Sequence, residues 1–66
     1  MRVLLKQWRT DAGLTQRNMG TRLRKPHTYA YKVEVGDRRL DALEFIQWCK
    51  ACNADPLKKF KELLSI

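Results

Sequence analysis

Four side chains with hydrogen-bonding groups lie at helical spacing in one short segment: His27, Thr28, Tyr31 and Lys32. Residues three or four positions apart lie on one side of a helix, so a helix here would present them together. Lysine can donate to guanine O6 and N7, threonine can bond either way, and tyrosine is long enough to reach a phosphate. This pattern predicts contact with the base edges of double-stranded DNA. The alternative is an ordinary solvated helix face.

Catalysis and metal binding have little support in the sequence. There is one histidine, no Ser-His-Asp arrangement and no Gly-rich phosphate loop, so we expect no enzyme activity and no cofactor. Cys49 and Cys52 read C-K-A-C, but a zinc site needs about four ligands, and His27 is distant in the sequence. Both cysteines fall on the apolar stripe of a predicted helix. This position favours buried, reduced thiols over a metal site or redox pair.

The charge of the chain favours an anionic partner. Its 66 residues include 14 Lys and Arg against 7 Asp and Glu, a net charge of +7. Such a charge attracts phosphates, and counterion release supplies affinity; solubility alone is the plainer reading. No apolar run approaches the roughly 18 residues of a membrane span, and the start M-R-V-L-L-K-Q-W-R lacks the features of a signal peptide. We expect a cytoplasmic protein that associates with the nucleoid by binding DNA.

Apolar periodicity and capping signals predict an all-α fold of five short helices around one core, in a single domain of residues 1–66. Thr15 is a predicted N-cap, and Asp41 with Glu44 forms a predicted capping box. Gly13, Gly36 and Asn53 are expected to end helices in the left-handed conformation. The predicted helices cover 2–12, 15–23, 26–35, a segment from 41 to about 52, and a segment from Asp55 with Pro56 in its first turn.

The second and third predicted helices form a helix-turn-helix at about 15–35, with only Arg24 and Lys25 between them. In this motif the second helix enters the major groove of DNA. Gly20 lies inside the predicted helix 15–23 and lowers its stability by about 1 kcal/mol relative to alanine. A glycine in that position predicts that another backbone passes close by.

The chain resembles the Xre/Cro-type helix-turn-helix domains of lambdoid phage repressors and small bacterial regulators. The matching residues are G-L-T-Q at 13–16, L-R-K-P-H-T-Y at 23–29, K-V-E-V-G at 32–36, D-R-R-L-D-A-L-E-F at 37–45 and A-D-P at 54–56. The resemblance implies a lambda-repressor-like fold, sequence-specific binding to double-stranded DNA, and a role in transcription, as a repressor. It covers about residues 4–60.

The resemblance also implies roles for single residues. His27, Thr28 and Lys32 match positions that touch bases, Gln16 and Tyr29 match phosphate contacts, and Arg9 with Glu34 matches a buried structural salt bridge. With the basic residues near this face, the phosphate contacts we expect are Thr15, Gln16, Arg17, Lys25, Tyr29, Arg38 and Arg39.

The sequence departs from the family pattern at several positions, and some alternatives stay open. Arg24 stands where the turn often has glycine, and Val35 stands where a phosphate contact is common. Trp48 could pack in the core or, with Leu43, Leu64 or Ile66, form a homodimer contact. A protein-interaction module of the same fold, with an unknown protein partner, is the main alternative function. A nonspecific RNA or membrane-surface binder is the third.

Overall fold

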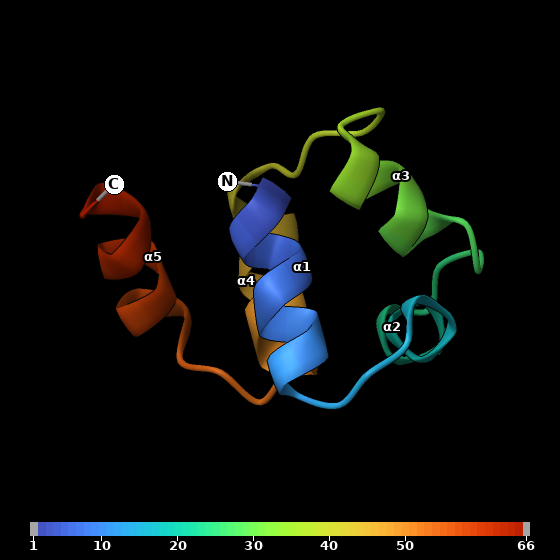
Figure 1. Cartoon of the computed structure of the whole chain (residues 1–66), viewed down its shortest axis with the longest axis horizontal. Coiled ribbons are helices and arrows are strands. Elements are labelled where there is room, and N and C mark those ends of the chain that lie inside the picture. Colours follow the sequence, from blue (N-terminus) through green and yellow to red (C-terminus); the bar gives the residue numbers. More distant parts are fainter. Residues whose placement is uncertain (1, 66) are drawn as a thin grey trace.

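The structure, a computed structural model that describes residues 2–65, consists of five helices joined by short connections (Figure 1). They are α1 (Arg2–Asp11), α2 (Gln16–Leu23), α3 (Tyr29–Val35), α4 (Ala42–Ala51) and α5 (Pro56–Leu64). α1 and α4 lie together at the centre, with α2 and α3 on one side and α5 on the other. No strand occurs within residues 2–65, and the predicted all-α class is confirmed.

The core lies among α1, α2, α3 and α4. Trp48 is fully buried, and its indole N–H donates to the Leu5 carbonyl at 3.1 Å. Trp48 is therefore a core residue, and the alternative that it forms a dimer contact is wrong. The buried apolar side chains are Leu5, Trp8, Met19, Tyr29, Ala30, Val33, Phe45, Trp48, Cys49 and Cys52.

The two cysteines are free and buried, as the apolar stripe predicted. Burial raises the pKa of the Cys49 thiol to about 11. Cys52 Sγ lies 4.0 Å from Met19 Sδ in the same core. A buried thiol with a raised pKa holds little thiolate at neutral pH, so both cysteines act as small apolar side chains.

The N-terminal caps form where the sequence predicted them. Thr15 Oγ1 accepts from the backbone of Asn18 at 3.0 Å, and the Asn18 side chain accepts from the Thr15 N–H. Asp41 and Glu44 form the second reciprocal box, and Asp55 accepts from an N–H in the first turn of α5. Each cap satisfies donors that the helix itself leaves without partners, so these local signals fix where the helices begin.

The start of α3 differs from the prediction. α3 begins at Tyr29 rather than at Pro26, so the connection is Arg24–Thr28 and not two residues. Arg24 adopts the left-handed conformation, with φ 56° and ψ 44°, and ends α2. Pro26 then begins a separate turn, in which the Tyr29 N–H donates to the Pro26 carbonyl at 2.9 Å. The fixed φ of proline suits a turn as well as a first helical position, and the sequence pattern did not distinguish these two uses.

Candidate nucleic-acid interface

Gly20 allows the turn between α2 and α3 to pass close to α2. A Cβ atom added at Gly20 would lie 3.1 Å from the Pro26 oxygen and 3.3 Å from His27 Cα. The Lys25 N–H also donates to the Gly20 carbonyl at 2.9 Å and holds the turn there. The predicted close approach of another backbone is confirmed, and that backbone belongs to the turn rather than to a crossing helix.

The turn and α3 together separate a buried side from an exposed side. Tyr29, Ala30 and Val33 are buried, whereas Tyr31 is 53% exposed and Lys32 is exposed. His27 and Thr28 are exposed in the turn before the helix, so helical spacing does not position His27. The Thr28 carbonyl accepts from the Lys32 N–H at 3.0 Å, which ties the turn to the first part of α3. All four residues with predicted base contacts are accessible.

A basic hollow lies beside this exposed side. Its volume is about 290 Å³, and its lining residues are Lys25, Pro26, Thr28, Tyr29, Lys32 and Arg38. The cations of Lys25 and Arg38 lie over the Tyr29 ring, at 5.6 and 5.1 Å from its centroid. Such contacts hold the cations in place by their attraction to the ring electrons. Three cations and a hydroxyl around one hollow suit an anionic group such as a phosphate.

Tyr29 faces the core and has an internal hydrogen-bond partner. It is 7% exposed, and its hydroxyl donates to Glu44 Oε2 at 3.3 Å. Burial raises the pKa of the phenol. The Tyr29 ring thus forms part of the wall of the basic hollow. A phosphate contact by its hydroxyl stays a prediction.

The other residues with predicted phosphate contacts fall into two groups. Thr15, Arg17, Lys25 and Arg39 are exposed, although the Thr15 hydroxyl already caps α2. Gln16 and Arg38 have side-chain partners within the protein. Gln16 Nε2 donates to Glu34 Oε1 at 3.1 Å, and Arg38 Nη2 donates to Glu44 Oε2. A DNA phosphate would have to share or replace these partners.

A buried ion pair fixes α3 against the end of α1. Arg9 Nε and Nη2 donate to the two Glu34 oxygens at 2.6 and 3.1 Å, and the two side chains are only 9% and 3% exposed. Arg9 Nη1 also donates to the Leu14 carbonyl at 2.6 Å. With the bond from Gln16, the Glu34 carboxylate accepts three donors, so neither charge is left without partners. The network sets the position of the exposed face relative to α1 and α2.

Sequence reasoning missed two residues that position this face. Glu44 was predicted only as part of a capping box, yet its carboxylate also accepts from Tyr29 and Arg38. The pKa of Glu44 is lowered, chiefly by the hydrogen bond from the Asp41 N–H and then by Arg38. Arg2 Nη1 donates to the Val35 carbonyl at 3.1 Å and joins α1 to the end of α3. No local signal marks either contact, because each joins segments that only the folded chain brings together.

Two further features bear on the class of site. Within residues 2–65 no group of three or more His, Cys, Asp or Glu could hold a metal ion. No helix in the described part of the chain is long and apolar enough to cross a membrane.

The arrangement of α2, the turn Arg24–Thr28 and α3 is that of a helix-turn-helix. No protein-family model and no curated protein matches the chain. It is similar to the solved structure of an XRE-family like protein from Pseudomonas syringae pv. tomato str. DC3000, with a TM-score of 0.91 and 34% sequence identity. The match covers 97% of this chain and 78% of that one. The chain belongs to the XRE family.

Proposed function

We propose that this protein binds specific sequences of double-stranded DNA and regulates transcription, as a repressor. The observation that carries the proposal is the exposed side of α3 and its turn, where His27, Thr28, Tyr31 and Lys32 lie accessible beside a basic hollow. The second helix of this motif enters the major groove, where each base pair presents its own pattern of donors and acceptors. In a cell the protein would lie at the nucleoid.

Different residues would contact the bases and the phosphates, according to their chemistry. Lys32 is suited to donate to guanine O6 and N7, and Thr28 can meet a base edge or a thymine methyl group. Arg17, Lys25 and Arg39 would neutralise phosphates, which positions the protein but carries no sequence information. His27 can donate or accept a hydrogen bond, according to its tautomer.

The test begins with selection of bound sequences from a random duplex library at near-physiological salt. Enrichment of one motif supports the proposal, whereas no enrichment by folded protein contradicts it. Lys32→Ala should then reduce the preference for the selected motif over random duplex, by about 1–3 kcal/mol at one base pair. Arg39→Ala should weaken binding to both duplexes equally and reduce the salt slope by roughly 1. Lys58→Ala on α5 is the matched control, because it removes one exposed positive charge far from α3.

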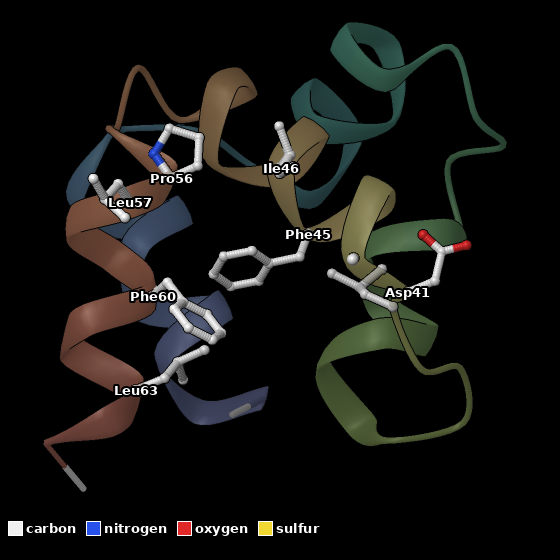
Figure 2. A pocket seen from close by; sticks show the side chains of 9 residues that line it. Asp41, Phe45, Ile46, Pro56, Leu57, Phe60 and Leu63 are labelled. Carbon is white, nitrogen blue, oxygen red and sulfur yellow. The ribbon is translucent and has the colours of Figure 1, made fainter.

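An apolar groove between α4 and α5 favours a protein contact in addition to DNA. The groove has a volume of about 470 Å³, and its lining residues are Leu40, Asp41, Ala42, Phe45, Ile46, Pro56, Leu57, Phe60 and Leu63. Figure 2 shows Phe45 of α4 pointing toward Phe60 and Leu63 of α5. The apolar side chains of α5 are only partly covered: no α5 residue is buried, and Leu57 and Leu64 are 62% and 72% exposed.

The occupant we propose for this groove is a second copy of the chain, bound on DNA. The charge of +7 on each copy opposes association in solution, and DNA phosphates would offset that repulsion. We therefore expect a monomer without DNA and two copies on an inverted repeat, with recognition helices about 34 Å apart.

Sedimentation with and without the selected duplex tests the second copy. Leu57→Ser should remove two-copy binding and keep binding to one half-site, whereas Val3→Ser, equally apolar and 76% exposed on α1, should change neither. Single-copy binding by the unaltered protein on an inverted repeat would refute the dimer. A stoichiometric copurified protein, together with absent DNA binding, would favour the protein-interaction module instead.

A further inference from the structure

The carboxylate of Glu44 lies beside the basic hollow at the start of α3. Its Oε2 accepts from Arg38 Nη2 and from the Tyr29 hydroxyl, and its Oε1 accepts from the Asp41 N–H at 3.1 Å. The Glu44 side chain is 15% exposed, whereas that of Arg38 is 45% exposed. The Glu44 carboxylate thus lies on the inner side of Arg38, and the outer side of Arg38 is open to solvent.

Arg38 is held between two groups. Its guanidinium carbon lies 5.1 Å from the centroid of the Tyr29 ring, and its Nη2 donates to Glu44. The Arg38 N–H donates to the Lys32 carbonyl at 3.2 Å, so the backbone of this residue is fixed to α3 as well. The hydrogen bond to Glu44 is the main reason that the pKa of Arg38 is raised. The guanidinium is therefore already paired with an anion before any DNA arrives.

We propose that Glu44 competes with DNA phosphate for Arg38 and so weakens binding of the basic face to DNA of any sequence. A carboxylate and a phosphate both accept hydrogen bonds from a guanidinium. Among residues 2–65, Arg38 is the one cation of the hollow that pairs with a carboxylate, and Lys25 and Lys32 make no salt bridge. With Glu44 in place, an approaching phosphate meets a nearly neutral Arg38–Glu44 pair.

The consequence for recognition is weaker binding to every duplex, with little change in sequence preference. Phosphate contacts contribute to nonspecific and specific complexes alike, so a built-in competitor lowers both affinities. Base contacts from Thr28 and Lys32 do not involve Glu44 and keep their contribution. Glu44 thus opposes DNA binding through Arg38, and this inference rests on the proposed DNA-binding function.

The experiment measures binding to a random-sequence duplex over a range of salt concentrations. Glu44→Gln removes the charge and keeps the capping box, because glutamine serves in that position. Glu62→Gln is the matched control: it makes the same change of charge on α5, where Glu62 accepts from Trp8 and pairs with Lys59, far from α3. Melting of each variant checks that it is folded.

Glu44→Gln should raise the affinity about two- to fivefold, the effect of one partly exposed charge pair. It should also make the slope of log K against log salt more negative, by up to about 0.9, because Arg38 becomes free to replace a counterion. Glu62→Gln should leave the slope unchanged. The gain should vanish in the Arg38→Ala background, since the competition requires the guanidinium.

Equal effects of Glu44→Gln and Glu62→Gln would overturn the inference, because net charge alone would then explain the gain. Weaker binding by Glu44→Gln would also overturn it, since Glu44 would then be orienting Arg38 toward the phosphate. Both of these results leave the proposed function standing. Failure of the unaltered protein to bind any duplex at low salt would overturn the proposed function, and this inference with it.

Discussion

Glu34→Ala should destabilise the protein more than any change at the exposed face of α3. Glu34 is 3% exposed in its side chain and accepts from Arg9 twice and from Gln16 once. Alanine removes the acceptor and strands the Arg9 guanidinium, whose side chain is only 9% exposed. Breaking a buried pair from one side costs about 3–5 kcal/mol, because the remaining charge keeps its desolvation penalty.

The size of this loss is large for a chain of 66 residues. At roughly 0.05–0.15 kcal/mol per residue, a chain of this length is stable by about 3–10 kcal/mol, so the change would remove a large part of the free energy of unfolding. At roughly 4–8 °C per kcal/mol for a domain of this size, the melting temperature should fall on the order of 20 °C. Lys32→Ala, an exposed change without a buried partner, should stay within about 0.5 kcal/mol.

Urea unfolding followed by tryptophan fluorescence measures the difference, since both Trp8 and Trp48 are buried in the folded state. Glu34→Gln is the informative control, because it keeps a hydrogen-bond acceptor and removes only the charge. The double change Arg9→Met with Glu34→Leu should recover much of the stability, since it removes both charges together. A loss below about 1 kcal/mol for Glu34→Ala would refute the reasoning, because that is the value of an exposed pair.

Three further predictions concern stability. Arg24→Gly should raise the free energy of unfolding by about 1 kcal/mol, since Arg24 has the left-handed φ of 56°. Asn53→Gly, at φ 55°, should raise it less, because asparagine tolerates this conformation. Equal gains for the two variants in urea unfolding would contradict this reasoning. Burial raises the pKa of Cys49 from 9.0 to about 11, so its contribution to stability is complete below pH 9 and is lost as the pH rises toward 11. Cys49→Ala should flatten that part of the stability curve, and an unchanged curve would argue against the shift. Trp48→Phe should lower the free energy of unfolding by about 2 kcal/mol or more, as measured by thermal melting. The smaller ring leaves a cavity and removes the hydrogen bond to the Leu5 carbonyl.

Local signals in the sequence were sufficient for most of the fold. Thr15, Asp41 and Asp55 predicted the starts of three helices, and each side chain accepts from its own first turn. Gly36 and Asn53 predicted left-handed ends and adopt them. These signals work because a cap depends on residues within about four positions along the chain. The same locality explains the error at α3, where Pro26 suited both a helix start and a turn.

The candidate site depended more on contacts between distant segments. Helical spacing correctly predicted that Tyr31 and Lys32 lie together on an exposed side of α3. Spacing did not reveal that Tyr29 is buried against the core, or that Arg38 is paired with Glu44. The pairing of Arg9 with Glu34 was implied only by resemblance to a family, because nothing local joins residues in α1 and α3.

The sequence by itself determined the helices, their order, the basic charge and the exposed side of α3, because these depend on composition and on neighbours along the chain. Only the tertiary structure decided which charges are free. It neutralised Arg38 with Glu44, fixed Glu34 with Arg9 and Gln16, and left Leu57 and Leu64 uncovered. The physical reason is that the strength of a charge or an apolar side chain depends on what surrounds it in space. That environment exists only after the helices have packed.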